Sequence, residues 1–138
     1  MSSVNHYKLN KLVRDKSVQR MENEGALVMW RELEQPQRIP HLLKKLQEEQ
    51  MEVHSAFAMG NREQMANELS DLMDVLHALA DAANIPMAEV MQHSEDKKRS
   101  RGGFSKGIYV DKIICPEGST FDVYCAKDPE KYPLAQRS

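Results

Sequence analysis

Two long segments in the middle of the chain carry apolar residues at the three-to-four-residue spacing of an amphipathic helix. The apolar stripe of residues 41–59 consists of Leu42, Leu46, Val53 and Phe57. The stripe of the next segment consists of Met65, Leu69, Leu72, Leu76 and Leu79. Gly60 suits the position that follows a helix end, and Asn61 suits the cap of the second helix. A connection this short predicts that the two helices are antiparallel neighbours.

Weaker patterns lie before and after these two segments. The sequence "SVQRMENEG" predicts a short helix that Gly25 ends,. Further on, "EQPQRIP" interrupts the chain, and Pro40 suits the first turn of the long helix that follows,. Pro86 opens another helix that runs to about Lys98. The stretch "ALVMWREL" alternates too poorly to be assigned as a strand.

The pattern changes after "RSRGG". The sequence "GIYVDKIICPEGSTFDVYCA" contains two β-leaning runs separated by the turn-like "PEGST", which predicts a small β-hairpin or an extended appendage. The fold class that we expect is therefore all-α, an antiparallel helical bundle with a small C-terminal appendage. The expected organisation is a helical domain over residues 1–110 and an appendage, hairpin and tail, over residues 111–138.

Composition agrees with a helical protein. Aromatic residues make up 6% of the 138 residues and methionines number nine, which favours a Leu/Met/Ala core over a β-sandwich. The formal net charge of −2 excludes a global basic field that would attract nucleic acid or a membrane surface,. No apolar signal-peptide core and no membrane-length apolar window occur, so we expect a cytoplasmic protein. The two cysteines, Cys115 and Cys125, form neither a disulfide framework nor a zinc spacing,.

Four carboxylates lie in or beside the two apolar stripes. Glu49 falls between Leu46 and Val53 in the first stripe, and Glu52 follows three residues later. Glu68 and Asp71 repeat that spacing in the second helix, and antiparallel packing would bring both pairs to one seam. Carboxylates in a seam repel one another unless a cation neutralises them. Oxygen ligands without a thiolate indicate a hard divalent ion, Mg²⁺ first and Mn²⁺ as its substitute.

Two other interpretations of these carboxylates stay open. Charged residues three apart on a helix usually form a solvated surface, and on pattern alone this interpretation has equal weight. A di-iron bundle also gathers glutamates, but it requires Glu-x-x-His on two helices. Only Asp74 and His77 approach that motif, on one helix. The stripe positions and the duplication on adjacent helices favour a shared magnesium site.

The sequence resembles the MazG-like all-α nucleoside triphosphate pyrophosphohydrolases. The motif EExxE…ExxD of that family corresponds to Glu48, Glu49 and Glu52 followed by Glu68 and Asp71. The flanking sequences "YKLNKLVRDK" and "KKRSRGGFSKGIYV" resemble its branch of house-cleaning and phosphoribosyl-ATP pyrophosphohydrolase-like proteins. The resemblance spans residues 7–110.

This resemblance implies Mg²⁺-dependent hydrolysis of a nucleoside triphosphate to the monophosphate and pyrophosphate, in nucleotide-pool house-cleaning. It implies that Glu49, Glu52, Glu68 and Asp71 hold the metal and that Glu48 or Glu49 serves as the catalytic base. It also implies a nucleotide as partner and a homodimer or higher homo-oligomer. The alternatives are a phosphoribosyl-ATP pyrophosphohydrolase and a helical interaction module that keeps the scaffold without catalysis.

Cationic side chains are expected to complete a phosphate site. The candidates are Arg14, Lys16, Arg101 and Lys106, and arginine suits forked contacts to phosphate. The alternative is that the basic residues near Gly102 and Gly103 only complement the end of a helix. The basic run "KKRSRGGFSK" contains a single aromatic residue and is short, so nucleic-acid binding is not the expected function.

Overall fold

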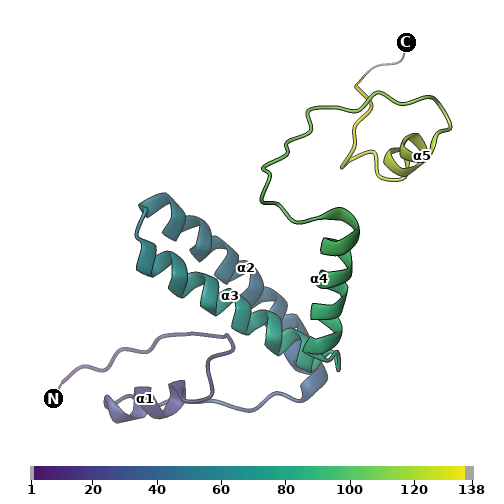
Figure 1. Ribbon diagram of the computed structural model, residues 1–138. Coiled ribbons are helices and arrows are strands. Elements are labelled where there is room, and N and C mark those ends of the chain that lie inside the picture. Colours follow the sequence, from purple (N-terminus) through teal and green to yellow (C-terminus); the bar gives the residue numbers. More distant parts are fainter. Residues whose placement is uncertain (1, 136–138) are drawn as a thin grey trace. The chain divides into compact units, whose positions relative to one another are not determined.

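The structure, a computed structural model, describes residues 2–135, and these contain five helices and no strand (Figure 1). The helices are α1 (Ser17–Asn23), α2 (Gln35–Met59), α3 (Arg62–Ala82), α4 (Met87–Arg101) and α5 (Thr120–Ala126). The expected all-α class is confirmed. The chain divides into two units, one up to Ser100 and one from Arg101 onward. None of the helices in this described part combines the length and apolar character that a membrane span needs.

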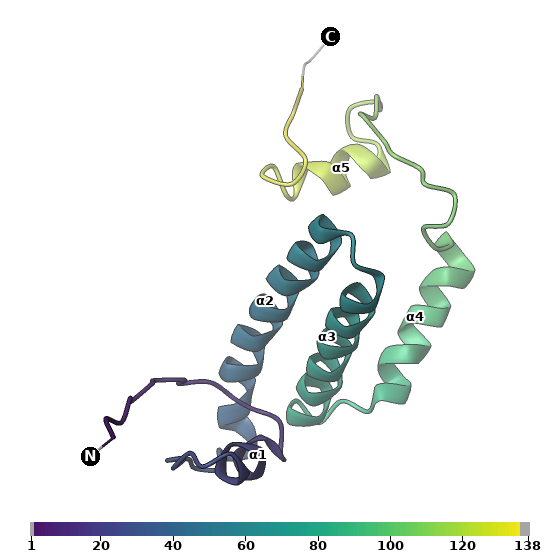
Figure 2. The same ribbon diagram turned by 90° about the vertical axis from the view of Figure 1, so that its left-hand side faces the viewer.

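Helices α2 and α3 form the antiparallel pair that the two apolar stripes predict, and they lie side by side in two perpendicular views (Figures 1 and 2). Gly60 ends α2 with a φ of 71°, a left-handed conformation that glycine adopts without strain,. The Asn61 side chain then accepts a hydrogen bond of 3.0 Å from the backbone N–H of Gln64 and starts α3,. Local capping chemistry therefore sets where the chain reverses.

Helix α2 begins earlier than the sequence predicts, at Gln35 instead of in the turn containing Pro40. The Gln37 side chain accepts a hydrogen bond of 3.3 Å from the Glu34 N–H, while Pro36 occupies the first turn, where no backbone N–H is needed,. Pro40 consequently lies inside the helix. At the same end, the Gln35 side chain donates a 2.8 Å hydrogen bond to the Asp81 carbonyl, which ties the start of α2 to the end of α3.

The buried face of α3 is rotated relative to the predicted stripe. Val75 is 6% exposed, whereas the predicted Leu76 is 47% exposed. Leu69 is likewise exposed, and Glu68 takes a half-buried position on the face toward α2. On α2, Ala56 is fully buried and the predicted Phe57 is exposed. The α2–α3 interface therefore contains small and polar residues where the apolar pattern predicts larger ones. Small side chains permit a close approach of two helices.

The predicted C-terminal β-hairpin is wrong. Its first run has no regular secondary structure, and its second run forms helix α5. The Asp122 side chain, in the first turn of α5, accepts a 2.7 Å hydrogen bond from the Gly118 N–H, and this local contact competes with strand pairing. Within the same unit the rings of Tyr124 and Tyr132 lie 5.5 Å apart. Cys115 and Cys125 are both free thiols.

The buried position of Ala56 generates a prediction about packing. Replacing Ala56 with Leu forces a larger side chain into the α2–α3 interface and should lower the free energy of unfolding by about 1–3 kcal/mol. The matched control is Ala58→Leu, because Ala58 is exposed on the same helix. Urea denaturation followed by circular dichroism measures both variants, and equal midpoints for the two would contradict the assigned interface.

Candidate metal centre

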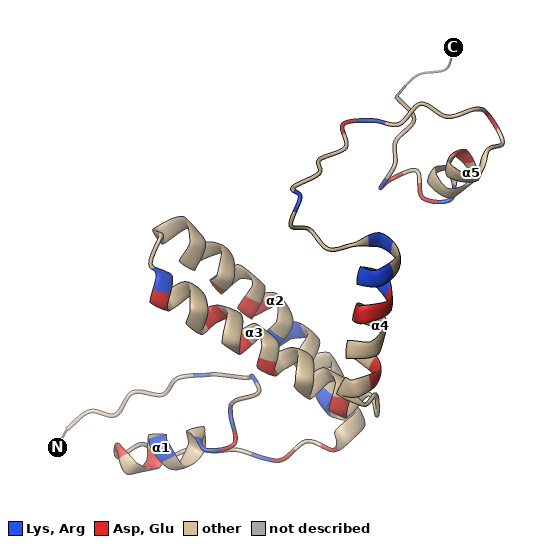
Figure 3. Ribbon diagram, in the orientation of Figure 1, with Lys and Arg blue, Asp and Glu red and all other residues tan. Residues whose placement is uncertain are grey.

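Three carboxylates meet between α2 and α3. Glu49 of α2 and Glu68 and Asp71 of α3 each offer an oxygen, and these oxygens all lie within 4.8 Å of one another. Glu49 is only 6% exposed. It is seven residues from both Leu42 and Ala56, the other buried residues of α2, so the helical repeat that buries them also buries Glu49. Figure 3 shows acidic positions along both helices of the pair.

Two of the carboxylate oxygens in this cluster lack a protein partner. Oε2 of Glu49 and Oε2 of Glu68 are buried, and neither accepts a hydrogen bond from any of residues 2–135. A buried carboxylate oxygen without a partner is unfavourable by several kcal/mol unless it is protonated or binds a cation. An all-oxygen donor set suits a hard divalent cation. The cluster therefore fits a metal such as Mg²⁺ and can hold one.

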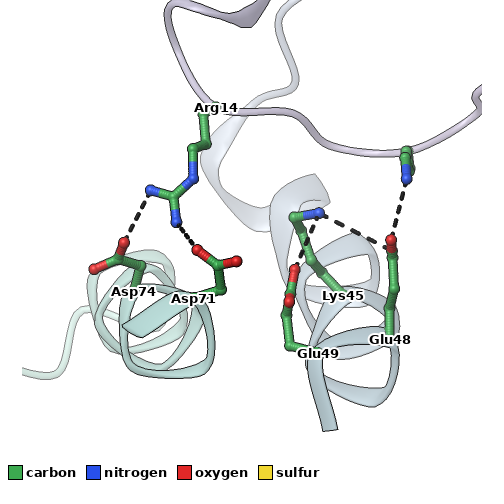
Figure 4. Close-up of polar contacts among 7 residues, drawn as sticks. Arg14, Lys45, Glu48, Glu49, Asp71 and Asp74 are labelled. Atoms are coloured by element: carbon green, nitrogen blue, oxygen red, sulfur yellow. Dashed lines mark hydrogen bonds and ion pairs between the residues drawn. The ribbon is translucent and has the colours of Figure 1, made fainter. Parts of the chain in front are cut away.

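Lysine side chains flank the α2 side of the cluster. Lys45 Nζ lies 3.6 Å from Glu49 Oε1 and 4.0 Å from Glu48 Oε2 (Figure 4). Lys11, from the segment before α1, donates a 3.1 Å hydrogen bond to Glu48 Oε1. One face of the carboxylate group is thus neutralised by protein cations, while the unpartnered oxygens of Glu49 and Glu68 are not.

Arg14 contacts the α3 side of the cluster. One terminal nitrogen of its guanidinium donates a 2.6 Å hydrogen bond to Asp71 Oδ1, and the other lies 2.8 Å from Asp74 Oδ2 (Figure 4). Arg14, which was predicted to bind phosphate, therefore forms ion pairs with two aspartates in this structure. Sequence reasoning did not assign Asp74, Lys11 or Lys45 to the site. Two spacings in the sequence could have indicated them. Asp71 and Asp74 are three residues apart and Lys45 and Glu49 are four residues apart, so each pair lies on one side of its helix.

Protonation of the α2 carboxylates differs along the helix. Burial, together with the nearby Glu52 charge, raises the pKa of Glu49 above the ordinary glutamate range despite the presence of Lys45. Loss of solvent and the adjacent Glu68 carboxylate also raise the pKa of Glu52. The hydrogen bond from Lys11, aided by the charge of Lys45, lowers the pKa of Glu48. Among Glu48, Glu49 and Glu52, only Glu48 has a pKa shift that favours its ionised form.

The remaining predicted residues are placed as follows. Glu52 is exposed and is not among the three residues whose oxygens cluster within 4.8 Å, so its role as a metal ligand stays a prediction. Lys16 occupies the N-cap position of α1, without a capping hydrogen bond from its side chain. Arg101 is the last residue of α4, and Lys106 follows in the C-terminal unit. Their roles in phosphate binding likewise remain predictions.

A cavity of about 260 Å³ lies beside Glu48. It is lined by Leu9, Asn10, Lys11, His41, Lys44, Lys45 and Glu48. Three lysines against one carboxylate give the lining an excess of positive charge. A small anionic group is the ligand that such a lining favours.

The fold and site together define an all-α protein with a candidate divalent-metal centre in an antiparallel helix pair. The sequence model of the phosphoribosyl-ATP pyrophosphohydrolase family matches residues 28–98, just over half of the chain. The chain belongs to this family, which confirms the predicted branch and places the protein among pyrophosphohydrolases. Searches among curated proteins and among solved structures give no match. The matched range includes all three clustered carboxylates but neither Lys11 nor Arg14.

The raised pKa values of Glu49 and Glu52 predict an unusual pH dependence of stability without divalent ions. Protonation of these groups favours the folded chain below the ordinary glutamate pKa, and this contribution is lost as the pH rises through the raised pKa values,. With EDTA present, the free energy of unfolding should therefore fall as the pH rises from the ordinary glutamate range through the raised pKa values of these two groups,. The lowered pKa of Glu48 acts at more acidic pH and does not oppose this trend.

Glu49→Gln should reduce that fall. At a pH above the raised pKa of Glu49, in EDTA, it should raise the free energy of unfolding by roughly 1–3 kcal/mol, because the amide can donate a hydrogen bond to Glu68,. Urea denaturation across the pH range measures it. Glu95→Gln, at an exposed residue of α4, is the control. A Glu49→Gln profile that parallels the wild type would show that Glu49 is not the group responsible.

Proposed function

We propose that this protein is a Mg²⁺-dependent pyrophosphohydrolase that cleaves a nucleotide between its α and β phosphates and releases a nucleoside monophosphate and pyrophosphate. The observation that carries this proposal is the cluster of Glu49, Glu68 and Asp71, with two buried oxygens that no described residue satisfies. Family membership supports the same reaction class.

The charges of substrate and site explain why a metal belongs in this proposal. A nucleoside triphosphate carries about four negative charges, and direct approach to three carboxylates would be repulsive. When bound, Mg²⁺ supplies charge neutralisation for phosphate oxygens and polarises a coordinated water. Glu49, Glu68 and Asp71 fix its position from two helices that the capped turn at Gly60 and Asn61 holds together.

Glu48 is the residue best suited to accept the proton of the attacking water. It adjoins Glu49 in sequence, and Lys11 and Lys45 favour its ionised form. Glu49 is the less suitable of the two predicted bases, because its unpartnered oxygen belongs to the metal cluster. Proton transfer to Glu48 leaves a neutral carboxylic acid beside two lysines, and its lowered pKa returns the proton readily to solvent.

The lysine-lined cavity beside Glu48 is the proposed position for a phosphate of the substrate. Its volume of about 260 Å³ lies below the range of about 300–1,000 Å³ typical of sites for whole ligands. It therefore suits a phosphate group and not a complete nucleotide. Lys45 connects the cavity to Glu49 across 3.6 Å, so a phosphate there would adjoin the metal centre.

The name of the matched family puts phosphoribosyl-ATP first among substrates to test. Nucleoside triphosphates of the cellular pool come second, in a house-cleaning role. One helix pair offers few walls around a base or sugar, and we propose that a homodimer or higher homo-oligomer completes the site. Exposed apolar residues on the outer face of α3, among them Leu69, Met73 and Leu76, are compatible with such assembly,.

Pyrophosphate release tests the proposed reaction. The wild type should release pyrophosphate from phosphoribosyl-ATP or from one of a panel of canonical and modified NTPs and dNTPs with Mg²⁺, and should not do so with EDTA. Glu49→Gln and Asp71→Asn should lower kcat at least about 100-fold, because each removes a metal ligand charge. Glu95→Gln should retain wild-type activity. Absence of release from every substrate by the folded wild type would instead support a non-catalytic helical module.

Substitution of Lys44 tests the proposed phosphate cavity. Lys44→Gln should raise KM about tenfold, equivalent to about 1.4 kcal/mol, because it removes one of the three positive charges that line the cavity. The kcat should change little, since Lys44 has no place in the metal cluster. Steady-state kinetics measure both parameters. Lys97→Gln, at an exposed residue of α4, is the control, and an equal KM for the two variants would contradict the assignment.

A further inference from the structure

The contacts of Arg14 join two aspartates of α3 through one planar group. Its two terminal nitrogens lie 2.6 Å from Asp71 and 2.8 Å from Asp74 (Figure 4). Asp71 belongs to the carboxylate cluster, whereas Asp74, one helical turn further on, does not. Arg14 reaches both from a segment 57 positions away in sequence from Asp71. The guanidinium thus links a cluster residue to an anchor outside the cluster.

Stability does not account for this arrangement. The Arg14 side chain is 59% exposed, and an exposed ion pair contributes at most about 1 kcal/mol to folding. The contact does affect the orientation of the Asp71 side chain. An aspartate on a helix surface can rotate about its side-chain bonds, and a hydrogen bond to Oδ1 restricts that rotation,. Asp74 in turn restricts the guanidinium, so the second Asp71 oxygen is held in a defined direction.

We propose that Arg14, anchored by Asp74, is a positioning residue that orients Asp71 for metal binding. This inference rests on the proposed metal centre, and it replaces the expectation that Arg14 contacts phosphate. Hydrogen-bonded partners of metal ligands commonly change metal affinity by about 10–100-fold. The forked geometry suits an arginine, since its two terminal nitrogens lie in one rigid plane and each contacts one aspartate, whereas a lysine offers a single ammonium on a flexible stem,.

A purely coulombic role of Arg14 and a positioning role predict opposite changes in divalent-cation affinity for Arg14→Gln. Arg14→Gln removes a positive charge beside the metal cluster, so a purely coulombic role would strengthen the binding of a divalent cation. A positioning role predicts weaker binding, because Asp71 loses its orientation. Asp74→Asn is a second variant, for which the loss of a nearby negative charge and the loss of the anchor both predict weaker binding. The sign of the change in Arg14→Gln therefore decides between the two roles.

The experiment is titration of the full chain with Mn²⁺, without nucleotide, with free Mn²⁺ measured by electron paramagnetic resonance. Arg14→Gln, Arg14→Lys and Asp74→Asn are each expected to weaken Mn²⁺ binding about tenfold. Asp96→Asn is the matched control, because Asp96 is an aspartate of similar exposure, 54% against 50% for Asp74, that also pairs with an arginine. It should bind Mn²⁺ like the wild type. Circular dichroism confirms folding of each variant.

Three results would overturn the proposal. If Arg14→Gln binds Mn²⁺ as tightly as the wild type or more tightly, while Asp71→Asn loses binding, the metal centre stands and the positioning role of Arg14 fails. If Asp71→Asn and Glu49→Gln also bind Mn²⁺ like the wild type, the metal centre fails and the positioning role fails with it. If Arg14→Lys restores the binding that Arg14→Gln loses, a single ammonium is sufficient to orient Asp71, and the forked contact with Asp74 is rejected.

Discussion

The rest of this structure depends on one constraint, the burial of the Glu49 carboxylate between two helices. Glu49 occupies the central position of the buried face of α2, with Leu42 and Ala56 one heptad away on either side. A carboxylate there requires neutralisation, because an isolated buried charge is strongly unfavourable. The protein meets the requirement in part with Lys45 and leaves Oε2 without a protein donor. Protonation, which the raised pKa of Glu49 favours, or the divalent cation that we propose would satisfy this oxygen,.

The cations around this carboxylate come from two separate parts of the chain. Lys11 and Lys45 neutralise the α2 side, and Arg14 neutralises the α3 side. Two of these three cations come from the segment before α1, outside the range that matches the family. The helix pair therefore supplies the carboxylates, and a separate part of the chain supplies much of the compensating charge.

The division also gives the site two chemically different halves. Carboxylate oxygens of Glu49, Glu68 and Asp71 suit a cation, and the lysine-lined cavity beside Glu48 suits an anion. A magnesium–polyphosphate complex carries both kinds of charge. Glu48 lies at the boundary, where its lowered pKa keeps it ionised. The proposed metal site, phosphate site and proton acceptor are therefore neighbours on the α2–α3 pair.

Much of this organisation is encoded locally and could be predicted from the sequence. Apolar periodicity predicted the two long helices, and Gly60 and Asn61 marked their connection, because capping depends on neighbouring residues alone. The i, i+3 repetition of carboxylates on both helices pointed to the cluster. The match to the family confirmed the same class.

Other features depend on contacts between distant residues and were decided by tertiary structure. The rotation of α3 that buries Val75 and exposes Leu76 follows from how closely two helix surfaces fit,. Helix α5 stands where a hairpin was predicted. The Gly118–Asp122 hydrogen bond lies at its start, and an isolated two-stranded hairpin is at best marginally stable,. The pairing of Arg14 with Asp71 and Asp74 joins segments far apart in the chain. Sequence alone determined which residues are able to form the site, and tertiary packing decided which of them meet, since only folding brings separate segments within the range of a hydrogen bond.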